Sequence, residues 1–196
     1  MSQVYDQSPI IILGNEQQSG CYILRMRVQQ PLQMHFGRFK GGKEIALRAG
    51  EYLYVGSALG AAGATSLAKR LVRHATRPDP LPPHPIRAAM LTYFHLLGLG
   101  KKPLVGPTPK KLFWHIDYVL QPLTVDLVQI FAIRTTRRLE PVLAQLLADE
   151  PYTFIIEKGL GASDHRGHTH LLGVQADDQW WAALVTKLQA LVTLDD

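Results

Sequence analysis

The stretch Gly50–His74, GEYLYVGSALGAAGATSLAKRLVRH, combines a short aromatic run, a segment of small residues and a basic run. Tyr52 and Tyr54 are two positions apart, so on a strand their side chains share one face. Between positions 56 and 63 almost every residue is Gly, Ala or Ser, which lets a backbone or a ligand come close. The stretch therefore predicts a strand, a small-residue turn and a helix, in that order.

The helix of this stretch carries the charged groups. Thr65 or Ser66 can cap its start. Arg70 precedes Arg73 by three positions and His74 by four, so all three side chains project from about the same side of the helix. Two guanidinium groups and an imidazole beside a turn of small residues suit the binding of a phosphate.

Upstream, 20–28 alternates apolar and polar side chains, with Arg25 and Arg27 on the side opposite Tyr22. This pattern predicts a strand with one exposed face. A hairpin partner is expected in 32–39, after Gln-Gln-Pro. Because sequential strands usually pair, we expect an antiparallel β-meander before the Arg/His helix.

Local patterns predict the remaining elements. Residues 10–13 form an apolar burst that is either an edge strand or a loose arm. Strands are expected over 113–120, 125–133 and 153–156, and helices over 86–97, 139–148 and 179–191. The fold class predicted from these elements is α+β: a small antiparallel β-sheet flanked by helices.

Positive charge is concentrated in one part of the chain. Residues 66–111 hold nine basic residues against one acidic residue, Asp79, whereas the whole chain has a net charge of +5. Such a local excess indicates a surface that faces a polyanion, and the alternative is a solvated basic face without a partner.

Cys21 is the single cysteine, so no intramolecular disulfide and no zinc site of the cysteine type are expected. No apolar run reaches the roughly 18 residues that a membrane span needs, and the N-terminal residues do not resemble a signal peptide. The expectation is a cytoplasmic protein that does not associate with membranes.

Several of these residues carry a resemblance to a known family. Gly20-Cys21-Tyr22, then Tyr54-Val55-Gly56, then Arg70 with His74 one turn later, resemble the core of the GIY-YIG nuclease superfamily. Two later stretches, 114–118 (WHIDY) and 161–171 (GASD through HL), are similar to an incompletely characterised subfamily that is sometimes fused to endonuclease III. The resemblance covers roughly residues 20 to 172.

Local patterns and the resemblance together indicate boundaries. Residues 1–19 would be an N-terminal arm or edge strand, 20–174 a GIY-YIG-like domain, and 175–196 a C-terminal helix. The subfamily usually crosses from the Arg/His helix to its Trp-His-Ile-Asp segment in fewer residues. We therefore expect a Pro/Lys-rich helical insertion at about 78–111, which is either a basic lid or arm or a surface elaboration without a function. His84 is expected to be a surface or insertion residue.

The resemblance implies a reaction as well. In that superfamily one divalent metal, here expected to be Mg or Mn, is held chiefly by a glutamate on a helix. Glu140, at the start of a predicted helix, matches that glutamate, and Glu51 and Glu157 are the fallbacks. Catalytic roles then fall to a set of five residues: Tyr22 and Tyr54 for the proton, Arg70 for the phosphate, His74 for the base or the phosphate, and Glu140 for the metal.

The expected partner is DNA, branched or damaged, together with a DNA-repair protein. The residues expected to contact nucleic acid share a positive charge: Lys69, Arg73, Lys101, Lys102, Lys110 and Lys111.

A second candidate metal site rests on residue types alone, because imidazole and carboxylate side chains are common metal ligands. Its six members lie in two stretches of the chain: His115, Asp117, Asp164, His165, His168 and His170. Hydrogen-bonded histidines that anchor a glycine loop are the alternative for these residues.

Three functions stay open at this point. The first is a metal-dependent DNA endonuclease of GIY-YIG type, acting in DNA repair or processing. The second is a nucleic-acid-binding module that keeps the fold without catalysis. The third is a histidine-loop metalloprotein with another substrate.

Overall fold

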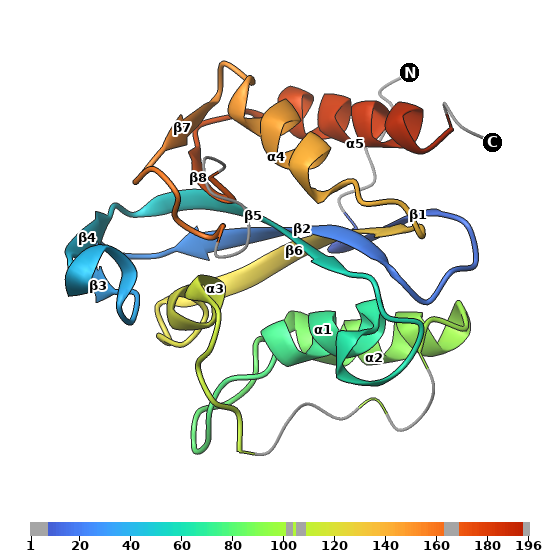
Figure 1. Ribbon diagram of the computed structural model, residues 1–196, viewed down its shortest axis with the longest axis horizontal. Coiled ribbons are helices and arrows are strands. Elements are labelled where there is room, and N and C mark those ends of the chain that lie inside the picture. The colour runs from blue at the N-terminus through green and yellow to red at the C-terminus, as the bar shows by residue number, and fades with distance from the viewer. Residues whose placement is uncertain (1–7, 101–103, 105–108, 163–168, 194–196) are drawn as a thin grey trace.

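The computed structural model of the chain describes residues 8–100, 104, 109–162 and 169–193. These residues form a six-stranded sheet with helices on both faces, and a separate two-stranded hairpin (Figure 1). The α+β class predicted from the sequence is confirmed. The strands are β1 (Ile10–Gly14), β2 (Gly20–Val28), β3 (Leu32–His35), β4 (Glu44–Leu47), β5 (Gly50–Ala58), β6 (Val125–Arg134), β7 (Thr153–Ile155) and β8 (Leu171–Val174). The helices are α1 (Leu67–His74), α2 (Ile86–Leu96), α3 (His115–Val119), α4 (Glu140–Ala148) and α5 (Asp178–Thr193), with short 3-10 turns at Phe39–Gly42 and Gly63–Thr65.

The large sheet has the strand order β1-β6-β2-β5-β8-β7. All neighbours pair antiparallel except β1, which runs parallel to β6 at one edge of the sheet. Of the two alternatives for residues 10–13, the edge strand is therefore the correct one. The central strands β2 and β5 place Tyr22 opposite Gly56 and Leu24 opposite Tyr54.

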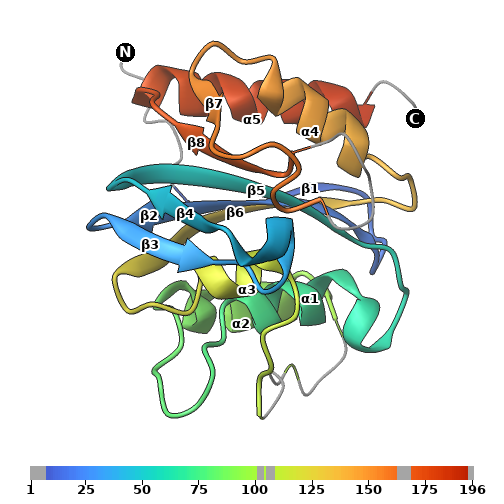
Figure 2. The same cartoon turned by 60° about the vertical axis from the view of Figure 1, so that its left-hand side comes forward.

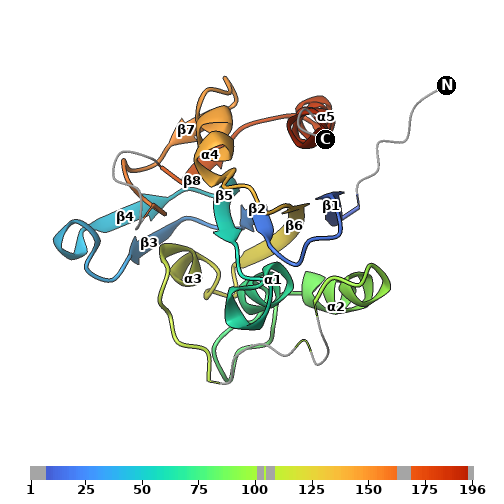
Figure 3. The ribbon, with the colours of Figure 1, turned by 45° about the vertical axis from the view of Figure 1, so that its right-hand side comes forward.

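The expectation that β2 has an exposed face is wrong. Helices α1, α2 and α3 cover one face of the sheet, and α4 and α5 cover the other (Figures 1 and 3). Tyr22 packs in the first core, and Ile23, on the opposite face of the strand, is fully buried in the second. Only the end of the strand keeps the predicted pattern, with Arg27 exposed. An alternating pattern read from one strand cannot show that a later helix covers its polar side.

The predicted β-meander is also incorrect in part. Strand β3 pairs with β4 in a hairpin of its own, which Figure 2 shows in front of the main sheet, and not with β2. Strand β2 pairs with β5 on one side and with β6 on the other. The short hairpin leaves the edge of β2 free for β6, a strand about a hundred residues later in the chain.

The strand expected over 113–120 is instead the short helix α3. The carboxylate of Asp117 accepts hydrogen bonds from the backbone N–H groups of Phe113 and Trp114, at 3.0 and 3.1 Å, and so closes the first turn. Ile116 and Val119 are then both buried, which matches helical spacing rather than alternation. The alternating apolar residues in 114–118 misled the strand prediction.

The segment 78–111 contains core residues in its described part. Met90 and Phe94 of α2 are fully buried in the same core as Tyr22. His84, expected to be a surface or insertion residue, lies in this segment but is buried. Its Nε2 bonds the carbonyl of Leu120 at 3.0 Å, and its Nδ1 accepts the N–H of Leu127 at 3.1 Å. This part of the segment is therefore packed into the fold and is not a detached arm.

Candidate functional site

A cleft of about 430 Å³ opens at the end of the sheet where β2 begins and β5 ends. Helices from both faces of the sheet contribute to it: Arg70 comes from α1 on one face, and Glu140 is the first residue of α4 on the other. The lining residues are Tyr22, Tyr54, Ser57, Leu59, Arg70, Trp114, Arg138, Glu140, Pro141, Gly161, Ala162 and His170. Four of the five predicted catalytic residues thus lie in one cleft.

Strand pairing explains how the two tyrosines come together. Tyr22 of β2 and Tyr54 of β5 are on the same face, with ring centroids 6.4 Å apart. Tyr22 lies opposite Gly56, and a Cβ at Gly56 would come within 2.5 Å of the Tyr22 hydroxyl. The glycine is therefore needed for the close approach of the Tyr22 ring, which gives the Tyr-x-Gly spacing a physical reason.

His74 is the predicted catalytic residue that does not line the cleft. It is buried behind Tyr22, whose hydroxyl lies 2.8 Å from His74 Nε2. Desolvation by burial, followed by the positive charges of Lys110 and Arg70, lowers the pKa of His74 well below its usual range. The imidazole is therefore neutral at pH 7 and can accept a proton from the phenol.

Burial raises the pKa of Tyr22, whereas it lowers the pKa of His74. Desolvation, and then the neighbouring Tyr54, raise the pKa of Tyr22 well above the usual value for a phenol, although Arg70 lowers it in part. At neutral pH Tyr22 therefore keeps its proton. The pair consists of a protonated phenol in hydrogen-bond contact with a neutral imidazole.

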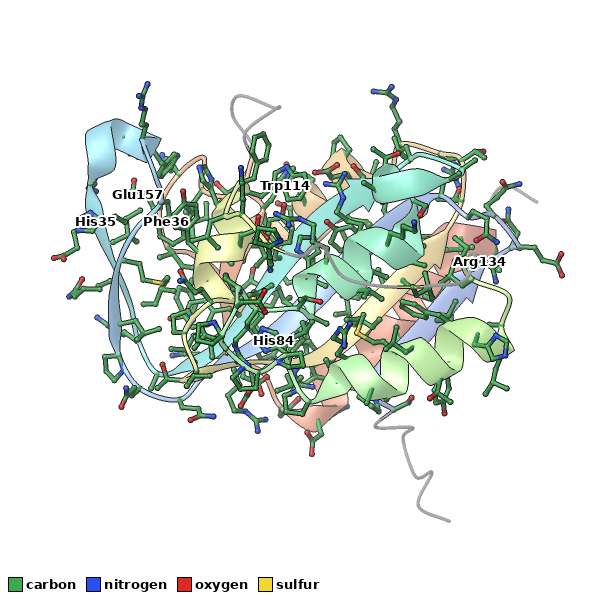
Figure 4. The ribbon with its side chains drawn as sticks, turned by 90° about the horizontal axis from the view of Figure 1, so that it is seen from below. His35, Phe36, His84, Trp114, Arg134 and Glu157 are labelled. Atoms are coloured by element: carbon green, nitrogen blue, oxygen red, sulfur yellow. The ribbon has the colours of Figure 1, made fainter. Side chains whose placement is uncertain are left out.

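Arg70 is held against an aromatic ring at the cleft. Its guanidinium carbon lies 4.1 Å from the centroid of the Trp114 ring, and that of Arg73 lies 4.8 Å from the same centroid. Figure 4 shows Trp114 at the start of α3, on the α1 side of the molecule. The Nε of Arg70 is buried and has no hydrogen-bond partner among the described residues. Arg70 thus presents an oriented guanidinium to the cleft.

Glu140 is positioned by two polar neighbours. The hydroxyl of Ser57 donates to Oε2 of Glu140, and Nδ1 of His170 lies 3.1 Å from Oε1. The side chain of Glu140 is 19% exposed, so the carboxylate is reachable from the cleft. The two fallback glutamates are placed elsewhere: Glu51 pairs with arginines of β2, and Glu157 pairs with lysines near the β3–β4 hairpin.

The described members of the second candidate metal site do not converge. Nδ1 of His115 accepts the N–H of Gly161 at 3.0 Å, Asp117 is buried beside Arg73, and His170 joins the cleft at Glu140. Among the residues that the structure describes, no group of three or more His, Cys, Asp or Glu side chains is placed to hold a metal ion. Asp164, His165 and His168 lie outside the described residues.

The residues expected to contact nucleic acid divide into three groups. Lys111 is exposed and Lys69 is half-buried. Arg73 donates to Asp117 at 2.6 Å, and Lys110, with only 1% of its side chain exposed, donates to the carbonyl of Thr76 at 2.7 Å. Lys110 is therefore buried and not exposed at the surface that a nucleic acid would contact, because its ammonium group has partners inside the fold. Lys101 and Lys102 lie outside the described residues.

Sequence reasoning missed several residues of the cleft, among them Ser57, Leu59 and Arg138. The strand pattern could have identified Ser57. Ser57 is an odd number of positions from Tyr54 and Gly56 along β5, so its side chain points to the other face of the sheet, toward Glu140 at the start of α4. Arg138 is exposed just before α4, and nothing in its local sequence indicates that the cleft lies beside it.

Comparisons with known sequences and structures add a family assignment. No curated protein and no solved structure matches the chain significantly. None of the helices that the structure describes is long and apolar enough to cross a membrane. The family described as domain of unknown function DUF123 matches residues 21–193, which include every described residue of the cleft. The chain belongs to the DUF123 family.

Proposed function

We propose that the cleft hydrolyses phosphodiester bonds in DNA, and that the protein is a metal-dependent endonuclease of the GIY-YIG type that its tyrosine motifs resemble. One observation carries the proposal: Tyr22, Tyr54, Arg70 and Glu140, spread over more than a hundred positions of the chain, line a single cleft. Two phenols, a guanidinium and a carboxylate are the groups that such a reaction uses.

Arg70 is the proposed phosphate-binding group. A guanidinium can donate to two phosphate oxygens at once and stays charged at all relevant pH values. Stacking on Trp114 orients it before a substrate arrives, which lowers the entropic cost of binding. Arg138, exposed at the same cleft, adds a second positive charge for the DNA backbone.

Tyr22 is the proposed proton acceptor for the attacking water, with Tyr54 as its neighbour on the same face. Because its raised pKa keeps Tyr22 protonated at neutral pH, the phenol can take a proton only while it passes its own to another group. Neutral His74, with Nε2 at 2.8 Å, is placed to receive that proton.

Glu140 is the proposed metal ligand, for Mg or Mn. A single, partly exposed carboxylate fits such an ion, because Mg²⁺ commonly binds through one or two carboxylates and keeps several of its waters. Ser57 and His170 hold the Glu140 carboxylate in place. When bound, the ion would supply positive charge that stabilises the phosphate oxygens as the bond breaks.

DNA is the proposed partner, with branched or damaged forms as candidate substrates and repair or processing as the role. The exposed Lys111 and Arg138 would contact strands that flank the cleft. Association with a DNA-repair protein and a cytoplasmic location, both expected from the sequence, remain part of this proposal. Contacts from Lys101 and Lys102 remain predictions.

The test is DNA nicking by purified protein in the presence of Mg²⁺ or Mn²⁺, with plain, branched and damaged duplexes as substrates. We expect cleavage by the wild type, and a loss of about 100-fold or more for Arg70→Ala and for Glu140→Gln. Glu140→Gln keeps the shape of the side chain and removes only its charge.

Arg48→Ala and Glu44→Gln serve as matched controls, because both residues are exposed and neither lines the cleft. These two variants should cleave like the wild type. Equal rates in the wild type and in both cleft variants would rule out the proposed assignment.

A nucleic-acid-binding module without catalysis is the second candidate. It is favoured by the contacts of Glu140 with Ser57 and His170, since both carboxylate oxygens already have neighbours within the chain. This candidate predicts DNA affinity that falls steeply with salt and is unaffected by chelators, without cleavage of any substrate. Binding and cleavage assays on the same samples separate the two candidates.

A further inference from the structure

Asp117 is a buried carboxylate that the proposed reaction does not yet use. It is fully buried, and its Oδ2 accepts hydrogen bonds from Arg73 at 2.6 Å and from the backbone N–H groups of Phe113 and Trp114. Its other oxygen, Oδ1, lies 3.5 Å from Nζ of Lys110. A fully buried carboxylate is costly unless its charge has partners, and these four groups supply them.

Two buried polar atoms face each other at this point. Oδ1 of Asp117, which also pairs with Lys110, lies 3.9 Å from Nδ1 of His74, and Nδ1 has no hydrogen-bond partner among the described residues. One is an acceptor and the other can be an N–H donor, so they are chemically complementary. Catalytic hydrogen bonds are often long in a free enzyme and tighten only when substrate binds.

We propose that Asp117 is a positioning residue, which keeps the proton of neutral His74 on Nδ1 and so leaves Nε2 to accept the proton of Tyr22. Tyr22, His74 and Asp117 then form a chain of three groups that reaches from the cleft to the buried carboxylate. The tautomer follows from geometry, because an imidazole nitrogen that faces a carboxylate is the one that carries hydrogen.

The charges around His74 fit this role. Arg70 and Arg73 lie on its own helix, Lys110 lies beside Asp117, and His84 adds to the positive field whenever it is protonated. Tyr22 and Tyr54 cover the imidazole from the sheet, and Trp114 lies against it with ring centroids 6.1 Å apart. The cations disfavour a resting imidazolium, whereas Asp117 is the negative group placed to stabilise one that forms briefly.

Two protons move in the proposed step. As the water oxygen bonds to the phosphorus, the bond from the phosphorus to the leaving oxygen breaks. In the same step the O–H bond of Tyr22 breaks, and a new N–H bond forms on Nε2 of His74. The phenol oxygen takes a proton from the attacking water, so Tyr22 ends the step protonated and His74 ends it as an imidazolium facing Asp117. Return of the proton to solvent or to the leaving oxygen restores the neutral pair.

The tautomer can be measured without any substrate. Nitrogen-15 NMR of the histidine rings distinguishes protonated from unprotonated nitrogens, and a His74→Gln spectrum identifies the signals of His74 among those of the other histidines. We expect Nδ1 to be protonated and Nε2 unprotonated in the wild type. Protonation on Nε2 instead would overturn the inference, and this measurement requires no variant of Asp117 to fold.

Asp117→Asn provides the second measurement. The amide oxygen can still accept from the backbone N–H groups of Phe113 and Trp114, which leaves the amide NH₂ toward His74. The proton of His74 should then move to Nε2, reversing the bond to Tyr22. An unchanged tautomer in folded Asp117→Asn protein would contradict the positioning role.

The catalytic consequence rests on the proposed function and is tested separately. In the nicking assay, Asp117→Asn should lower kcat by about 100-fold or more and leave KM within a few-fold of the wild type. Asp149→Asn, an exposed carboxylate on the opposite face, is the matched control. If no sample cleaves DNA but the tautomer is as expected, the proposed function fails and the arrangement of His74 stands. A wild type that cleaves DNA and an Asp117→Asn variant with the same kcat would reject the positioning role.

Discussion

Gly56 shows how one residue determines the shape of the cleft. It lies opposite Tyr22 in the pairing of β2 with β5, and the Tyr22 ring occupies the space that a side chain at position 56 would fill. Tyr22 is buried under α1, so its ring cannot swing aside at low cost. The hydrogen bond between Tyr22 and His74 therefore depends on the absence of a single methyl group.

At this scale we predict that Gly56→Ala lowers the free energy of unfolding by about 1–3 kcal/mol, because the added methyl overpacks the core against Tyr22. Urea unfolding measures the change. Gly173→Ala is the matched control: its Cβ would meet the ring of Phe154, which is 43% exposed and can move away. An equal loss in the two variants would show that Tyr22 does not impose the constraint.

Among the elements, α5 illustrates how one cap and one apolar stripe produce a helix. Asp177 precedes the first helical residue, and its Oδ1 accepts the N–H of Trp180 at 2.9 Å. Trp180, Leu184 and Leu188 recur at helical spacing and are buried against the second face of the sheet. Both the start of the helix and its buried face follow from local sequence.

We predict that Asp177→Ala destabilises the protein by about 1 kcal/mol, because the N–H of Trp180 loses its acceptor. Asp177→Asn keeps an acceptor at the same position and should stay within about 0.5 kcal/mol of the wild type. Thermal and urea unfolding of the three proteins measure the difference. Equal stability of the alanine and asparagine variants would argue against a capping role.

For the whole molecule, His84 joins the segment after α1 to the sheet. Its Nε2 donates to the carbonyl of Leu120 and its Nδ1 accepts from the N–H of Leu127, an arrangement that only the neutral imidazole can make. Desolvation, and then the charge of Arg77, lower the pKa of His84 to about 3. The folded protein therefore binds fewer protons here than the unfolded chain, whose histidine titrates near pH 6.5.

Because the folded pKa of His84 lies below the unfolded value, its contribution to stability is complete above about pH 6.5 and is lost as the pH falls toward 3. Between pH 7 and pH 5 the loss should be about 2 kcal/mol. His84→Gln keeps a donor and an acceptor but does not titrate, so its stability should fall less over that interval. Urea unfolding at pH 7, 6 and 5 tests this, and parallel curves for the two proteins would contradict it.

Sequence patterns predict the longer strands and helices well, and they fail for the shortest helix. Strands β2 and β6 and helices α1, α2, α4 and α5 were predicted close to their observed bounds, because their patterns repeat over many residues. Strand β5 was predicted too short, since it continues to Ala58, inside the expected turn of small residues. Helix α3 was missed, since five residues are too few for a clear period and Asp117 closes its first turn through hydrogen bonds that alternation does not reveal.

The amino-acid sequence alone determined most of the strands and helices, and which residue types are available for phosphate chemistry. Only the tertiary structure decided that Lys110 is buried, that His170 belongs with Glu140, and that Asp117 faces His74. The physical reason is the separation along the chain of the residues that interact. Secondary structure depends on backbone periodicity and on neighbours within a few residues. The contacts of Lys110 with Thr76, of His170 with Glu140 and of Asp117 with His74 instead join segments 30 or more positions apart, which only packing brings together.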